Sequence, residues 1–84
     1  MDLLLYLREL SSKLLSIGEN KAGNCVVMAS RYASGSPSEF LHEARDALDV
    51  VRSKYSNILP EYDVERISNV ISQLDASFKR IGGA

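Results

Sequence analysis

Apolar residues recur along the chain at spacings of three and four, the periodicity of α-helices with one buried face. This spacing predicts helices over residues 2–17, 21–34, 37–56 and 63–81. No run of alternating apolar and polar residues and no Asn-Gly or Asp-Gly hairpin turn indicates a strand. We therefore expect an all-α fold: a small antiparallel bundle of four helices, or of three helices and one short additional helix.

The first predicted helix has a leucine-rich stripe with a start signal and a stop signal. The stripe consists of Leu3, Leu7, Leu10, Leu14 and Ile17, widened on one side by Leu4 and Leu15. Asp2 is the expected N-cap, and Gly18 fits the position just beyond the end. At 100° per residue, Leu5 and Tyr6 are expected to point away from the stripe.

The second predicted helix has the weakest pattern, with Asn20 as its expected N-cap. Its inner face is expected to hold Ala22, Cys25, Val26, Ala29, Tyr32 and Ala33, with Met28 at the edge. Many of these side chains are small, which lets a neighbouring helix approach closely. Gly23 lowers the helix propensity of the segment, and Val27 faces outward.

The third predicted helix has the clearest start signal. Ser36 as N-cap, Pro37 at the first position and Glu39 at the third form a capping box. Its apolar arc comprises Phe40, Leu41, Ala44, Ala47, Leu48, Val51 and Tyr55. The stripe of the fourth comprises Val64, Ile67, Val70, Ile71, Leu74, Phe78 and Ile81, and Gly82-Gly83 is expected to end it.

Composition narrows the class of protein. With 84 residues, the chain is expected to form one domain over residues 1–84, and 45 % apolar and 25 % charged residues are typical of globular proteins. A net charge of −1 without a basic run argues against a nucleic-acid partner. The lone Cys25 fits a reducing compartment. Because neither a signal sequence nor a run of about 20 apolar residues is present, we expect a cytoplasmic protein without a membrane partner.

A row of acidic residues on the third predicted helix is the main candidate site. Glu39, Glu43 and Asp46 lie opposite the apolar arc, with His42 and the fourth acid of the row, Asp49, on one flank. A metal site needs ligands that converge from several directions, so we expect neither metal nor cofactor here. Two interpretations remain: acids that favour the positive end of the helix dipole, or a surface that docks a basic protein.

The predicted directions of the side chains around their helices argue against both catalysis and DNA binding. Cys25 would need a base to act as a nucleophile, and the outward phase of His42 keeps the two apart. No G-x-S-x-G motif or phosphate-binding glycine loop is present. As a recognition helix, residues 37–56 would present carboxylates where DNA phosphates lie closest.

Apolar residues away from the stripes offer a second candidate surface. The residues concerned are Leu4, Leu5, Tyr6, Leu59 and Tyr62, which would form an interface-sized patch if they met in space. The alternative is that Ile58 and Leu59 only cap the end of the core. Tyrosine is enriched at interfaces, so Tyr6 and Tyr62 are the predicted partner-binding residues of this set.

The sequence therefore predicts a non-enzymatic helical module that binds another protein. A more specific hypothesis is an immunity-type inhibitor that covers a basic toxin with Glu39, Glu43, Asp46 and Asp49. One alternative is a homo-oligomeric structural subunit that associates through Leu4, Leu5 and Leu15 of its first helix. A further alternative is a helical protein with a catalytic role that no motif reveals.

Overall fold

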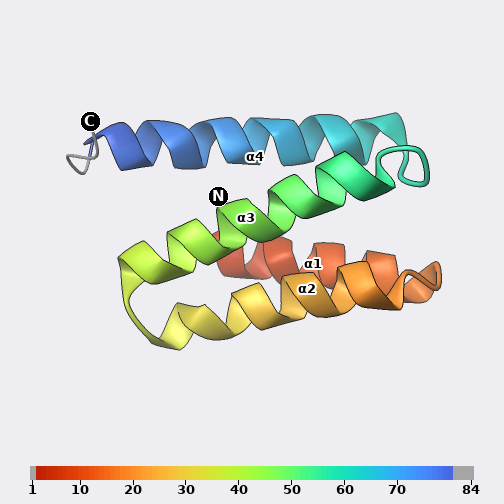
Figure 1. The fold of residues 1–84 in the computed structure, drawn as a ribbon, viewed down its shortest axis with the longest axis horizontal. Helices are drawn as coiled ribbons and strands as arrows, with labels where there is room; N and C mark the ends of the chain where they lie inside the picture. The colour runs from red at the N-terminus through yellow and green to blue at the C-terminus, as the bar shows by residue number, and fades with distance from the viewer. Residues whose placement is uncertain (1, 81–84) are drawn as a thin grey trace. The chain divides into compact units, whose positions relative to one another are not determined.

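The computed structural model describes residues 2–80, and this part of the chain contains helices and no strand. The elements are α1 (Leu3–Ser16), α2 (Asn20–Ser30), the 3-10 helix η1 (Arg31–Ser34), α3 (Pro37–Tyr55) and α4 (Glu61–Arg80) (Figure 1). The predicted all-α class with four α-helices is confirmed. The predicted helix end at Ile81 and Gly82-Gly83 lies outside the described residues.

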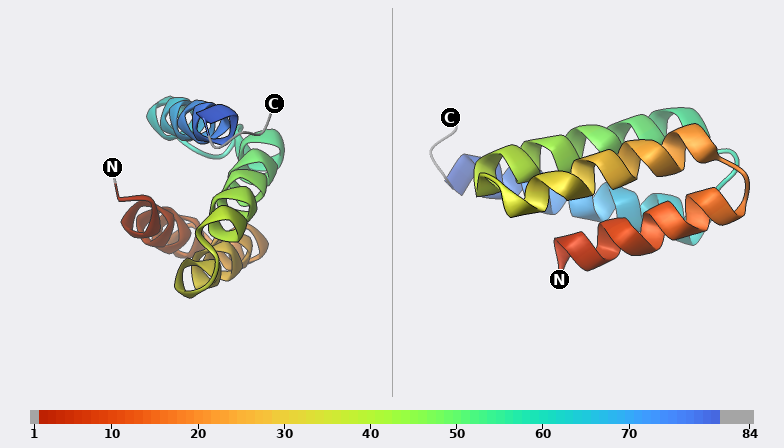
Figure 2. Two further views of the ribbon diagram at one scale, coloured as in Figure 1. Left: turned by 90° about the vertical axis from the view of Figure 1, so that its left-hand side faces the viewer. Right: turned by 90° about the horizontal axis from the view of Figure 1, so that it is seen from below.

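Contacts divide the chain into two units, Met1–Ala47 and Leu48–Ala84. The first unit contains α1, α2, η1 and the first half of α3. Within it, α1 and α2 run antiparallel and side by side (Figure 2). The second unit contains the last turns of α3, the connection over residues 56–60, and α4.

The predicted signals at both ends of α1 are confirmed. At the start, the Asp2 carboxylate accepts a hydrogen bond of 3.1 Å from the backbone N–H of Leu5. This bond satisfies one of the donors that a helix leaves open in its first turn. At the end, Gly18 adopts a φ of 87°, a backbone conformation that disfavours every residue with a Cβ.

The turn after α1 shows why the predicted N-cap of α2 is wrong. The N–H of Gly18 donates to the carbonyl of Leu15 at 3.1 Å, and the N–H of Glu19 donates to that of Leu14 at 2.9 Å. This pair of bonds is the standard closure of a helix by a left-handed glycine. Glu19 completes the closure and also occupies the N-cap of α2, without a side-chain cap bond. Asn20 is therefore the first residue of α2.

The buried core follows the predicted stripes in most positions. The largest fully buried side chains are Leu7, Leu14, Val26, Leu48, Val51, Ile67 and Val70. Ile17 is an exception, since 46 % of it is exposed although the stripe placed it in the core. It is the C-cap of α1 with φ −94° and ψ 8°, so the chain has already left the helix and the 100° phase no longer applies.

The predicted inner face of the second helix is wrong at its end. Tyr32 and Ala33 are exposed, and Cys25 is half-buried. The helical segment extends to Ser34 as predicted, but its last four residues form η1. A 3-10 helix turns by about 120° per residue, so side chains beyond Ser30 leave the face that the α-helical phase predicts.

Gly23 is buried where α1 and α2 come close together. A Cβ added to it would lie 2.6 Å from Cγ of Leu15 and 2.7 Å from Cδ2 of the same side chain. These separations are well below carbon–carbon contact, so a side chain at this position would force Leu15 or one of the two helices to shift. The glycine that weakens the helix propensity of α2 is thus also what lets the two helices pack.

The start of α4 differs from the prediction by two residues. The carbonyl of Pro60 accepts from the N–H groups of Asp63 at 2.9 Å and Val64 at 3.2 Å, so the helix begins at Glu61. Asp63 is buried, which the hydrophobic pattern did not predict. It lies in the first turn, where the helix dipole stabilises a carboxylate.

Candidate functional site

Three carboxylates of the predicted acidic row project from successive turns of α3. Glu39 and Asp46 are exposed and Glu43 is half-buried. At 100° per residue the three lie within an arc of about 60°, and over seven residues they span about 10 Å along the helix axis. None of the three forms a hydrogen bond or an ion pair with another of residues 2–80. We call these three residues the acidic row from here on.

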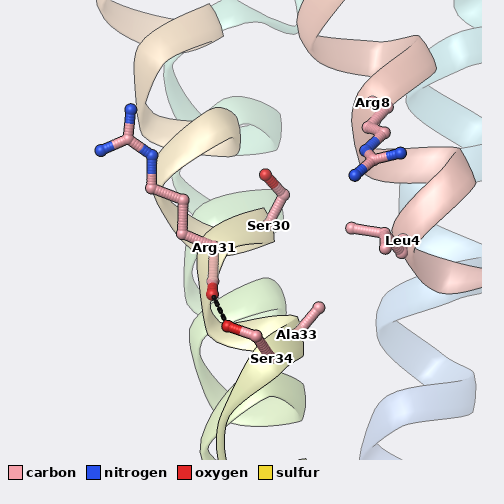
Figure 3. A pocket seen from close by; sticks show the side chains of 6 residues that line it. All are labelled: Leu4, Arg8, Ser30, Arg31, Ala33 and Ser34. Atoms are coloured by element: carbon pink, nitrogen blue, oxygen red, sulfur yellow. Dashed lines mark hydrogen bonds between the residues drawn. The ribbon is translucent and has the colours of Figure 1, made fainter.

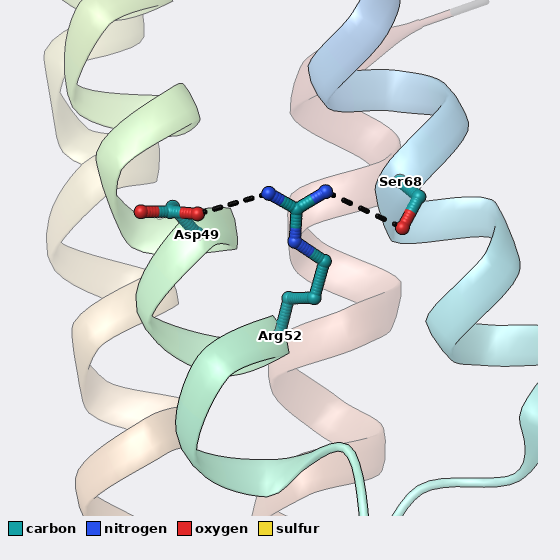
Figure 4. A network of polar contacts seen from close by, with 3 residues as sticks. All are labelled: Asp49, Arg52 and Ser68. Atoms are coloured by element: carbon teal, nitrogen blue, oxygen red, sulfur yellow. Dashed lines mark hydrogen bonds and ion pairs between the residues drawn. The ribbon is translucent and has the colours of Figure 1, made fainter.

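The fourth predicted member, Asp49, is held by a partner instead. Its Oδ1 accepts from Nη2 of Arg52 at 3.1 Å, and Nη1 of Arg52 lies 3.4 Å from Oγ of Ser68 on α4 (Figure 4). The side chains of Asp49 and Arg52 are 43 % and 37 % exposed, so solvent screens the pair and it contributes at most about 1 kcal/mol. Its charge is balanced by Arg52 on the same helix, and Arg52 in turn reaches α4, so Asp49 does not extend the acidic row.

The polar candidates for chemistry do not assemble into a cluster. His42 is exposed on α3 and Cys25 is half-buried on α2. Over residues 2–80, no group of three or more His, Cys, Asp or Glu side chains is placed to hold a metal ion.

The two tyrosines predicted to bind a partner have opposite environments. Tyr62 is 70 % exposed at the start of α4, as a partner-binding residue must be. The expectation that Tyr6 points away from the core is wrong, because it is only 6 % exposed. Its large ring extends the buried face of α1 beyond the leucine stripe. Leu59 is also buried while Ile58 is exposed, so of these two residues only Leu59 belongs to the core.

A groove that sequence reasoning missed lies between α1 and the α2–η1 segment. It encloses about 460 Å³ and is lined by Leu4, Arg8, Ser30, Arg31, Ala33 and Ser34. In Figure 3, Leu4 and Arg8 on α1 face Ser30 and Ala33 across it, whereas the Arg31 guanidinium extends away from α1. Neither arginine forms an ion pair with a carboxylate in the described part of the chain.

The sequence indicates this groove only through the positions of glycine and small residues along α2 and η1. Leu15 packs against Gly23 near the α1–α2 turn, whereas at the other end of the pair two side chains, Leu4 and Arg8, face the small residues Ser30 and Ala33. The glycine lets α1 and α2 pack closely near the turn. At the far end of the pair, the small side chains do not fill the space between the two helices, so a groove remains. We call this feature the Arg8 groove.

None of the helices in the described range 2–80 has the length and apolar character that a bilayer span requires. Comparison with protein-family models, with curated proteins and with solved structures finds no match to this chain.

Proposed function

We propose that this chain is a non-enzymatic protein-binding module, and that the acidic row of Glu39, Glu43 and Asp46 is its docking surface for a basic partner. The observation that carries the proposal is that these three carboxylates lie on one face of α3 and make no ion pair within residues 2–80. Asp49 is excluded from the surface because Arg52 already balances its charge.

The physical properties of α3 suit this role. The helix has 19 residues, so it holds the three carboxylates at a fixed spacing and little conformational entropy is lost when a partner binds. Fixed charges of one sign guide the approach of an oppositely charged partner and determine its orientation. With a Debye length of about 8 Å at physiological salt, this guidance acts only over short range, so the partner must present its basic groups directly to the row.

The specific form of this proposal is an immunity-type inhibitor that covers a basic toxin. The size of the chain and the acidic row support it. A second candidate function is self-association through α1, for which the exposure of Leu5 is the supporting observation. Leu15, also predicted to take part, has its side chain against Gly23 and is therefore partly engaged inside one copy.

Affinity capture tests the docking surface. The bait is the wild-type chain, a row variant (Glu43→Lys with Asp46→Lys), or a control variant of equal charge (Glu9→Lys with Glu65→Lys), in which both altered residues are exposed and lie on α1 and α4. Proteins from cells that express the chain are quantified by mass spectrometry at about 0.1 M and about 1 M salt, which shortens the Debye length from about 10 Å to about 3 Å.

The proposal requires at least one basic protein that wild type and control retain and the row variant loses, with capture weakened at high salt. Equal capture of every protein by all three baits would refute it. Circular dichroism of each variant verifies that the helices are intact, so that loss of binding is not loss of folding.

A further inference from the structure

The Arg8 groove carries positive charge that nothing in the described chain neutralises. Its six lining residues include two arginines and no acid. The hydroxyls of Ser30 and Ser34 donate to the carbonyls of Val27 at 2.6 Å and Arg31 at 3.2 Å. Their donor capacity is therefore used within the chain, and the guanidinium of Arg8, which faces α2–η1 across the groove, supplies the donors that remain open there.

The remaining lining favours a carboxylate on a short aliphatic stem. Leu4 on α1 and Ala33 on η1 provide apolar surface on opposite sides of the groove (Figure 3). Glutamate and aspartate present methylene groups followed by a carboxylate, so their stems can contact this apolar surface while the carboxylate reaches Arg8. A helix that offers such side chains on one face matches both properties of the groove.

The same unit of this chain carries a helix of that kind. The acidic row, on the first half of α3, and the Arg8 groove both belong to Met1–Ala47. We infer that the Arg8 groove receives the acidic row of a second copy of this chain, in a two-fold symmetric dimer where each copy gives one row and accepts one. In a two-fold interface residue i of one copy contacts residue j of the other and j contacts i, so one row and one groove on each copy give two equivalent contacts.

This inference rests on the proposed function, because the acidic row is the docking surface in both. It adds the identity of one partner and the surface on that partner. Exposed ion pairs contribute little individually and the groove is small, so the dimer is a weak, salt-dependent assembly rather than an obligate one. It forms at high protein concentration and leaves the row available to a tighter basic partner at low concentration.

Charge reversal on each side of the contact tests the inference. One variant has a reversed groove (Arg8→Glu with Arg31→Glu), and the other a reversed row (Glu43→Arg with Asp46→Arg). Sedimentation equilibrium measures self-association of the wild type, of each variant, of an equimolar mixture of both, and of the control Glu9→Arg, in which an exposed α1 residue is altered. Protein concentrations extend to about 1 mM, which detects association as weak as about 4 kcal/mol.

The wild type and control should dimerise at about 0.1 M salt and dissociate at about 1 M, where the Debye length is about 3 Å. Each reversed variant should weaken dimerisation at least about tenfold, a loss of about 1.4 kcal/mol. The mixture should restore it to within about threefold of wild type, because the reversed row fits the reversed groove and the native row fits the native groove. A merely structural defect in either variant would not be repaired by mixing.

Three outcomes would overturn the inference: a wild type that stays monomeric at about 1 mM, dimerisation that neither reversal affects, or a mixture that does not recover. The capture experiment separates this failure from failure of the proposed function. If the reversed row still loses a basic partner while the wild type is monomeric, the docking surface stands and self-recognition is rejected. If no partner is lost and no dimer forms, both are rejected.

Discussion

Substitution of Gly23 by alanine tests whether the close approach of α1 and α2 governs this part of the fold. A Cβ at position 23 would lie 2.6 Å from Cγ of Leu15 and 2.7 Å from its Cδ2, both shorter than any normal carbon–carbon contact. Cγ is near the base of the leucine side chain, so the clash is removed only if Leu15 adopts a different χ1 rotamer or the helix shifts. A helix allows leucine only two χ1 rotamers, which limits the change of rotamer.

The effect of Gly23→Ala on the free energy of unfolding is the sum of a favourable helix-propensity term and an unfavourable steric term. Alanine in place of glycine stabilises a helix interior by about 0.8–1 kcal/mol. One added methyl group in a closely packed contact costs about 1–3 kcal/mol. The steric term is larger, so Gly23→Ala should lower the free energy of unfolding by about 1 kcal/mol, equivalent to a fall in Tm of about 4–8 °C for a chain of this size.

The same substitution in a Leu15→Ala background should have the opposite sign. Without Cγ and Cδ2, the nearest atom to the new Cβ is the backbone nitrogen of Leu15 at 3.4 Å. The propensity term then dominates, and Gly23→Ala should stabilise the protein by about 0.5–1 kcal/mol. The coupling energy of the double-mutant cycle is accordingly about 2 kcal/mol.

Urea unfolding followed by circular dichroism gives the four free energies of the cycle, and a constant m-value verifies that the unfolded state is unchanged. Gly35→Ala is the matched control, because the nearest atom to its added Cβ is the carbonyl oxygen of Tyr32 at an ordinary 3.6 Å. Its effect should stay within about 0.5 kcal/mol. If Gly23→Ala changes the free energy of unfolding in the same direction with and without the Leu15 side chain, a steric clash with Leu15 is not the reason for the glycine.

Two further predictions concern the end of α1. Gly18→Ala should lower the free energy of unfolding by about 1–2 kcal/mol in chemical denaturation, because φ is 87° there and alanine is strained in that region; an unchanged midpoint would contradict the observed closure of the helix. Leu14→Ala should lower the free energy of unfolding by about 2–5 kcal/mol because Leu14 is fully buried, whereas Ile17→Ala should lower it by less than about 1 kcal/mol because Ile17 is largely exposed. Thermal or urea unfolding measures both effects, and equal losses of stability would mean that Ile17 belongs to the core.

The candidate site was only partly predictable from sequence. Glu39, Glu43 and Asp46 could be placed on the outer face of α3 because a regular helix converts spacing directly into direction. The pairing of Asp49 with Arg52 was not predicted, because whether two surface side chains meet depends on their rotamers and on Ser68 of another helix. The Arg8 groove required knowing how two helices separate along their length, which no single helical pattern contains.

Local physics in the sequence determined the helices of this protein and most of their ends. Asp2, Gly18 and Pro37 set helix boundaries through bonds and backbone preferences that involve only neighbouring residues. Tertiary structure decided what each side chain meets: it buried Tyr6 and Asp63, exposed Ile17, and made Gly23 a packing requirement. The reason is that a periodic pattern fixes the direction of a side chain from its own helix, whereas burial depends on the neighbouring helix that occupies that direction.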